Sequence, residues 1–425
     1  MVSLRRWLNA AFGVSVLAFS PFAVRAEGLS LAEAQRRALA NAPQIDASDA
    51  GVRASRELAV SAGRRPDPVL RLGVDNLPVT GPDAFTIGND FMTMRRVGVM
   101  QEFTRGEKLE RRRDRYEAQA VKGEAEREAA VTSVLRDVAL AWIDRYYAGR
   151  IVDALVDERD QALQEVEAAQ ALYRSSRGSQ ADVLAARLSV ANIEDRIGEA
   201  QARRQAADAG LARWVGTNDP ASPAGPLDIG TVPEHLLAPH VAELEFHPDV
   251  VAATRAVDLA QADVRIAEAE RNPDWTWELS YSHRGSAYSD MVSVGVSVPV
   301  PWDRPNKQDR DIAAKRAFLD QAAAQREVML REHRAEVSAL VAEWKGGLAR
   351  LRRFDAEILP LARERGEAAL AAYRGLKGSL GDVLAARRAS IETRIQRLQL
   401  EAETARAWAK LNFLFPVDLP ARGRP

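Results

Sequence analysis

The amino-acid sequence predicts a mainly α-helical chain with a small membrane β-barrel part, built from two copies of one unit. Three observations support this fold class. A segment of fifteen residues recurs 200 positions later, long stretches place apolar residues three and four apart, and four short segments alternate apolar with polar residues. These patterns indicate duplicated long helical hairpins and four β-strands in each chain.

The first 26 residues have the features of a secretory signal peptide. Two arginines open the segment, a mostly apolar stretch follows, and the expected cleavage site lies between Ala26 and Glu27. A retained N-terminal anchor is the alternative, but Ser20-Pro21 would break its helix before that site. No other run approaches the roughly 18 apolar residues of a membrane-spanning helix, so none is expected.

Composition excludes several classes of protein. The signal peptide removes three of the 59 Lys and Arg residues and none of the 60 Asp and Glu residues, which leaves a net charge of about −4 and no basic excess for nucleic-acid binding. The chain has no cysteine, which rules out disulfides and thiolate metal sites. It also has no Gly-Lys-Ser/Thr phosphate loop and no nucleophile motif, so we expect neither an enzyme nor a bound cofactor.

A duplication organises the chain. Residues 173–187 and 373–387 are identical at ten of fifteen positions. Earlier matches keep the same order in both halves; examples are Ala42-Pro43 with His247-Pro248 and Val97-Gly98-Val99 with Val294-Gly295-Val296. We therefore expect a signal peptide at 1–26, a first repeat at 27–215, a Pro-rich linker at 216–240, a second repeat at 241–415 and a C-terminal tail at 416–425.

Each repeat is expected to contain one very long helix, over Gly106–Tyr173 in the first and Asn306–Tyr373 in the second. At about 1.5 Å per residue, each helix would span on the order of 100 Å. Two seams show coiled-coil spacing; they are Val337, Val341, Trp344, Leu348 and Leu351, and Ile391, Ile395, Leu398, Ala402, Ala405 and Ala409. Helices with such narrow seams pack between neighbours, as in a ring of helices.

Four short segments read as strands, at Leu70–Asp75, Arg96–Met100, Trp275–Ser282 and Val292–Val300. In each, an apolar face alternates with charged and small polar residues, which is typical of a barrel wall between lipid and water. An ordinary hairpin with one buried face is the alternative, but it fits poorly beside helices too long for a compact core to cover. Four strands cannot close a membrane barrel, so we expect a homotrimer that shares about twelve strands above an α-helical tunnel.

Several motifs resemble TolC-type outer-membrane efflux factors. They are the duplicated pattern Tyr-x8-Asp-Val-Leu-x-Ala-Arg at 173–187 and 373–387, the segment Gln101–Lys108 before a long helix, and the opening motif at 29–43. Within this family the chain is most similar to the outer-membrane components of heavy-metal resistance-nodulation-division efflux systems.

The resemblance implies a passive exit duct in the bacterial outer membrane, with its helical part in the periplasm. The implied partners are outer-membrane lipid, a periplasmic membrane-fusion adaptor protein and an inner-membrane resistance-nodulation-division pump. The implied cargo is heavy-metal ions such as copper and silver, or cobalt, zinc and cadmium. A duct for drug efflux or type I protein secretion is the alternative, and a periplasmic coiled-coil structural or adaptor protein is a further one.

The hairpin turns carry the expected functional residues. Asp182 and Asp382 follow the two turns at equivalent positions, so a trimer would gather six carboxylates around a periplasmic gate. Nearby basic residues lie close enough in sequence to pair with them; these are Arg174, Arg177, Arg374 and Lys377. The alternative role for each Asp is to cap the helix that follows.

The resemblance places adaptor docking at the turns themselves, at Gly178, Ser179, Gly378 and Ser379. The family usually has Gly three residues after the tip Tyr, where this chain has Ser176 and Leu376. Ala385 stands where the family has a second gate acid. These departures concern the geometry of the turn and of adaptor docking.

Metal-binding candidates are few. Met92 and Met94 share one face, and thioethers suit Cu(I), although such methionines more often pack or face lipid. Three histidines fall in or beside the linker, at His235, His240 and His247. They are interpreted as solvated residues of a linker rather than as a metal site.

Overall fold

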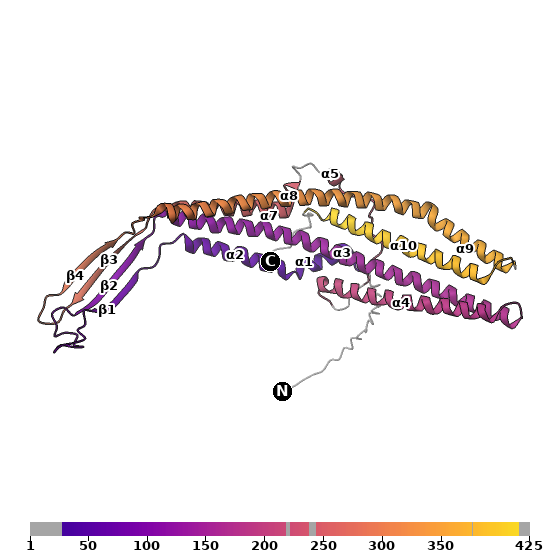
Figure 1. Cartoon of the computed structure of the whole chain (residues 1–425), viewed down its shortest axis with the longest axis horizontal. Coiled ribbons are helices and arrows are strands. Elements are labelled where there is room, and N and C mark those ends of the chain that lie inside the picture. Colours follow the sequence, from indigo (N-terminus) through magenta and orange to yellow (C-terminus); the bar gives the residue numbers. More distant parts are fainter. Residues whose placement is uncertain (1–27, 218–221, 238–243, 376, 416–425) are drawn as a thin grey trace, which may run out of the picture.

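The chain is long and narrow, with a β-sheet at one end and the tips of two helical hairpins at the other (Figure 1). The computed structural model describes residues 28–217, 222–237, 244–375 and 377–415. The signal peptide expected at 1–26 and the tail expected at 416–425 lie outside these residues. Within the described ranges, no helix combines the length and the apolar character that crossing a membrane requires.

The four expected strands form one antiparallel sheet. They are β1 (Val69–Asp75), β2 (Met94–Phe103), β3 (Trp275–His283) and β4 (Met291–Ser297), and they neighbour one another in that order. Strands β2 and β3 join the two repeats, with Val97 opposite Tyr281. The strand expected to run to Val300 ends at Ser297 instead. Ser297 lies opposite Thr276, near the start of β3, and Pro299 has no N–H with which to continue the ladder.

The first repeat supplies four helices, α1 (Leu31–Ala40), α2 (Pro43–Ala62), α3 (Gly106–Arg174) and α4 (Gln180–Val215). Their ends follow local signals. Ser30 caps α1 by accepting a hydrogen bond from the Glu33 amide, and Gly216 ends α4 in the left-handed conformation with φ of 73°. Helix α3 has 69 residues without a break, so the first long helix is confirmed.

The second repeat supplies α5 (Glu234–Leu237), α7 (Pro248–Glu270), α8 (Gln308–Arg353), α9 (Leu359–Arg374) and α10 (Leu380–Asn412). The prediction of one continuous helix from Asn306 to Tyr373 is wrong, because a π turn at Phe354–Ile358 separates α8 from α9. Pro360 explains the wider turn. It cannot donate to the carbonyl of Ala356, and its ring would clash with that carbonyl in a regular helix.

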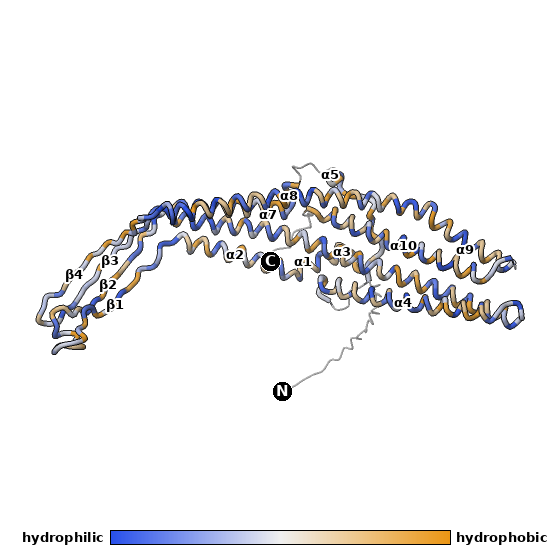
Figure 2. The backbone as a smooth tube through the Cα atoms, in the orientation of Figure 1, coloured by the Kyte–Doolittle hydropathy of each residue, from blue (hydrophilic) through white to orange (hydrophobic). Residues whose placement is uncertain are grey.

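The main core lies midway along the molecule, where α1, α3, α8 and α10 meet. Both expected seams face this core or the smaller buried cluster that follows it along the hairpins. Every seam residue is buried except Leu348, which is half-buried. Figure 2 shows the same pattern as short apolar and polar stretches that alternate along each helix. The seams are therefore confirmed, and two narrow seams suffice to hold helices of this length side by side.

Candidate functional site

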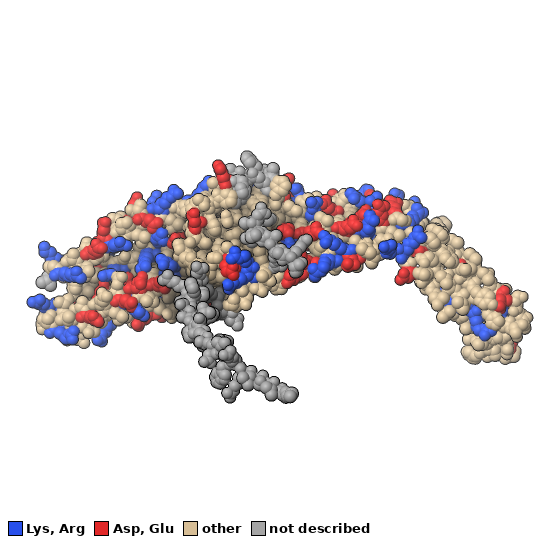
Figure 3. All heavy atoms as spheres, turned by 180° about the vertical axis from the view of Figure 1, so that it is seen from behind, with Lys and Arg blue, Asp and Glu red and all other residues tan. Residues whose placement is uncertain are grey.

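One face of the sheet is continuously apolar. The strand register sets these side chains in two rows across all four strands, Leu70, Val99, Leu279 and Val294, then Leu72, Val97, Tyr281 and Val292. Their exposed fractions lie between 38% and 74%. Figure 3 shows that the sheet end carries few charged residues, whereas the helical part is covered with them. An exposed apolar surface of this extent indicates contact with lipid or with another chain.

The opposite face of the sheet holds charges and small residues. Arg96 pairs with Asp75 at 2.6 Å, and its guanidinium lies 3.9 Å from Glu278. Arg71 lies 3.5 Å from the same carboxylate. Between these charges the backbones approach closely, since a Cβ on Gly98 would lie only 2.9 Å from the Ser280 Cβ. The alternation seen in the sequence thus separates an apolar face from a polar one, as predicted.

Both aspartates expected at the gate take part in helix caps. At the start of α4, Asp182 accepts from the Ser179 amide at 3.0 Å and from its hydroxyl at 2.7 Å. Its own amide donates to Ser179 Oγ at 3.1 Å, which completes a capping box. Ser379 and Asp382 repeat these contacts at 3.1, 2.7 and 3.1 Å at the start of α10. The hydrogen bonds from each Ser lower the pKa of both aspartates, and the capping alternative is confirmed.

The two hairpin turns share one closing hydrogen bond although their residues differ. Ser176 adopts a φ of 59°, the left-handed conformation that a Gly at this position would take without strain. The amide of Arg177 donates to the Leu172 carbonyl at 2.9 Å, and that of Lys377 donates to the Ala372 carbonyl at the same distance. Leu376, the counterpart of Ser176, lies outside the described residues. The two turns therefore share the hydrogen bond that closes the helix end.

The two hairpins pack against each other near their tips. Val183 and Ala186 of α4 share a buried cluster with Leu380 and Val383 of α10. The contact brings Tyr373 of the second hairpin close to the first. Burial, followed by the negative charge of Asp182, raises the pKa of Tyr373.

The four basic candidates remain at the surface of the tips. All of them are exposed, and they are Arg174, Arg177, Arg374 and Lys377. Figure 3 shows Lys and Arg side chains gathered at the hairpin ends. Among the described residues, no ion pair joins these four to Asp182 or Asp382. Their pairing with these aspartates in the assembled channel stays a prediction, and so does the gate itself.

A charged contact between the hairpins escaped the sequence reasoning. Glu165 of α3 pairs with Arg387 of α10 at 2.8 Å, and its side chain is only 12% exposed. Burial raises the pKa of Glu165 and also that of Glu158, two helical turns away. Arg387 is the last residue of the duplicated motif, and this recurrence is the sequence signal that could have marked it as important. Nothing in the sequence pointed to its partner 222 residues earlier.

The metal candidates lie apart from the hairpin tips. Met92 is exposed in the loop before β2, and Met94 opens that strand. Their role in copper binding stays a prediction. His247 is 5% exposed and caps α7, so its interpretation as a solvated linker residue is wrong. The side chain of His235 and the whole of His240 lie outside the described residues.

Comparison with known proteins covers both repeats. A sequence model of the family "Outer membrane efflux protein" matches residues 34–217 and 241–415. The cobalt-zinc-cadmium resistance protein CzcC of Cupriavidus metallidurans is 25% identical over 293 residues, which are 66% of this chain and 68% of CzcC.

Solved structures share the fold. A crystal structure of CusC matches with a TM-score of 0.77 and 15% identity, over 91% of this chain and 92% of CusC. VceC of Vibrio cholerae matches with a TM-score of 0.71 and 18% identity, over 90% of this chain and 95% of VceC. The family match spans most of the chain and both helical hairpins, and the TolC-type resemblance is confirmed. This chain belongs to the outer membrane efflux protein family.

Proposed function

We propose that this outer-membrane efflux channel works as a homotrimer in which three sheets close one barrel of about twelve strands. The observation that carries the proposal is the four-stranded sheet, which has an apolar exposed face and ends at β1 and β4. In lipid, an open sheet edge would leave backbone groups unsatisfied at several kcal/mol each. Pairing β4 of one chain with β1 of the next removes every edge.

The same arrangement gives the tips a function. Six copies of the capping-box aspartates, two from each chain, would surround the periplasmic end of the tunnel. The exposed basic residues beside them supply partners for a closed state. We assign the periplasmic gate to this ring of acids and bases. Docking of the adaptor is assigned to the turn residues Gly178, Ser179, Gly378 and Ser379, which lie at the ends of the hairpins.

The proposed partners are a periplasmic adaptor and an inner-membrane pump of the resistance-nodulation-division class, since the chain has no phosphate loop with which to drive transport. The proposed cargo is heavy-metal ions. The name of CzcC as a cobalt-zinc-cadmium resistance protein supports this choice. Drug efflux and protein secretion use the same kind of duct and differ in the pump that feeds it.

Two experiments test these proposals. Native mass spectrometry of the detergent-extracted protein is expected to give a trimer, and a stable monomer would contradict the shared barrel. Deletion of the gene is expected to make cells sensitive to cobalt, zinc or cadmium. Expression of this chain in the deletion strain is expected to restore resistance. Sensitivity to drugs with unchanged metal resistance would favour the drug-efflux alternative.

A further inference from the structure

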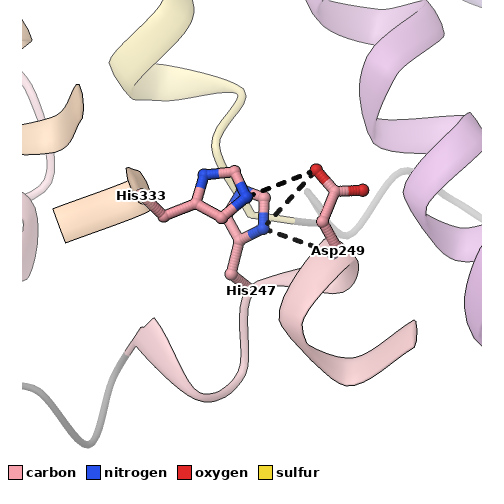
Figure 4. A group of neighbouring side chains, drawn as sticks. All are labelled: His247, Asp249 and His333. Carbon is pink, nitrogen blue, oxygen red and sulfur yellow. Dashed lines mark hydrogen bonds and ion pairs between the residues drawn. The ribbon is translucent and has the colours of Figure 1, made fainter. Parts of the chain in front are cut away.

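Three metal-ligating side chains converge beside the start of the second repeat (Figure 4). His247 immediately precedes α7, Asp249 lies in its first turn, and His333 projects from α8. Asp249 Oδ2 lies 3.8 Å from His247 Nδ1 and 3.6 Å from His333 Nε2. One ligand atom from each residue falls within 4.8 Å of the others. Among the described residues, these three form the group of His, Cys, Asp or Glu side chains whose ligand atoms all lie within this limit.

The spacing suits a small transition-metal ion. Zn–N and Zn–O bonds of about 2.0–2.1 Å in a tetrahedral site place ligand atoms about 3.3 Å apart. The two distances to Asp249 exceed that value by only a few tenths of an ångström. The two imidazole nitrogens lie within 4.8 Å of each other, so the three ligand atoms would close around one ion by side-chain rotation, with water in the fourth position.

The ring of His247 is buried and presents an unprotonated nitrogen at the cluster. His247 is 5% exposed, and its ring lies 3.9 Å from that of His333, centroid to centroid. The Nδ1 of His247 accepts a hydrogen bond from the Asp249 amide at 3.2 Å and so carries no proton. An ion at Nδ1 would replace this long hydrogen bond.

The surrounding charges leave room for a cation. Glu336 Oε2 lies 3.4 Å from His333 Nδ1, behind the ring, as carboxylates often lie behind metal-binding histidines. Arg136 of α3 and the N-terminus of α7 oppose a cation. The carboxylates of Asp249 and Glu336 offset both. The side chain of Asp249 is 45% exposed and gives an ion access from solvent.

The duplication supplies an internal comparison. When Pro43 is aligned with Pro248, the first-repeat counterparts of His247 and Asp249 are Ala42 and Gln44. When Trp142 is aligned with Trp344, the counterpart of His333 is Val131. The first repeat thus forms the same helix pair with Ala at the cap and Val on the long helix. The fold does not require the three ligands, so their presence in the second repeat needs another explanation.

We propose that His247, Asp249 and His333 bind one divalent transition-metal ion of the zinc class in each chain. The ion would be held by His247 Nδ1, one carboxylate oxygen of Asp249 and His333 Nε2. Imidazole and carboxylate ligands together suit Zn²⁺ and Co²⁺. The site would tie the first turn of α7 to α8 at the entry to the second repeat. It is a resident site on the helical part and does not depend on which cargo the duct exports.

Zinc titration of the purified, chelator-treated trimer tests the site. Calorimetry is expected to show one saturable Zn²⁺ site per chain. His333→Gln is expected to weaken binding more than about 100-fold, because loss of a supporting carboxylate alone costs about 10–100-fold. Glu336→Gln should fall within that smaller range. His247→Asn removes the imidazole but retains a good cap for α7, so a folding defect does not confuse its result.

His283→Gln is the matched control, since His283 pairs with Asp290 at 2.7 Å in the sheet end of the molecule. It is expected to bind Zn²⁺ like the unaltered chain. Co²⁺ added in place of Zn²⁺ should give the visible absorption of a four-coordinate site in the control and lose it in His333→Gln. The absence of saturable Zn²⁺ binding would overturn the proposal. Binding that His247→Asn and His333→Gln leave unchanged would overturn it equally.

Discussion

The indole Nε1 of Trp344 donates a hydrogen bond to the carbonyl of Ile229 at 2.9 Å. In the first repeat, Trp142 makes the same contact with Leu29 at 2.8 Å. Both carbonyl-bearing residues are buried, and they lie 200 positions apart in the sequence. The segment around Ile229 is therefore the counterpart of the segment that opens the first repeat. We propose that the second repeat begins within the stretch expected to be a linker at 216–240.

Trp344→Phe is predicted to loosen this segment. The change removes the N–H and leaves the Ile229 carbonyl without its donor in a buried place, at a cost of about 1–3 kcal/mol. Hydrogen exchange measured by mass spectrometry should become faster in residues 222–237. Trp302→Phe is the control, because that side chain is 92% exposed. Equal acceleration in both variants would show that the hydrogen bond does not hold the segment.

The faces of the sheet predict opposite results for two neighbouring substitutions. Val294 lies on the apolar face opposite Leu279, and Ser293 lies on the polar face opposite Ser280. Val294→Arg is expected to impair assembly by about 2–4 kcal/mol if it lies near the bilayer midplane. Ser293→Arg should assemble and change the conductance. The yield of detergent-resistant trimer measures both, and equal losses would contradict the face assignment.

Ser176→Gly is predicted to stabilise the first hairpin tip. The left-handed φ of 59° costs a non-glycine residue about 1–2 kcal/mol, part of which is offset by the greater freedom of Gly in the unfolded chain. A net gain of about 0.5–1 kcal/mol should slow exchange of the Arg177 and Gly178 amides, which both donate to Leu172. Ser175→Gly, at a φ of −87°, should give no such gain. Faster exchange in Ser176→Gly would show that the turn is not strained there.

Features with a short sequence period were predictable. The seam at Val337–Leu351 and the alternation at Trp275–Ser282 follow from the geometry of a helix and a strand, and the structure buries or pairs them accordingly. The Pro360 interruption was missed because the expected helix was extended to Tyr373, although its seam ended at Leu351. A missing backbone donor then decides where the regular helix stops.

Contacts between distant residues were not predictable. His247 and His333 are 86 positions apart, and no periodic pattern links a linker residue to one turn of a long helix. The ion pair of Glu165 with Arg387 is a similar case. The first contact depends on how α7 packs against α8, and the second on how the two hairpins pack against each other. Local propensity encodes neither. The capping boxes, in contrast, follow from a Ser three residues before an Asp, and they were expected as an alternative.

The gate requires two variants that separate charge from capping. Ser379→Ala removes the hydroxyl that accepts from the Asp382 amide and keeps the carboxylate. Loss of such a cap costs about 1 kcal/mol, so exchange at the start of α10 should become faster. Asp382→Asn removes the charge and keeps an oxygen that can accept from the Ser379 amide, so the helix start should stay protected.

Ion selectivity then decides whether the carboxylates line the entrance. A ring of acids attracts cations and repels anions, and this effect is strongest where the tunnel is narrow. We expect planar-bilayer recordings of trimeric Asp382→Asn to show lower cation selectivity and weaker block by multivalent cations from the periplasmic side. Ser379→Ala, which keeps the charge, should resemble the unaltered channel. If Asp382→Asn keeps normal selectivity as a trimer, the aspartate serves only to cap α10, and the gate must lie elsewhere in the hairpins.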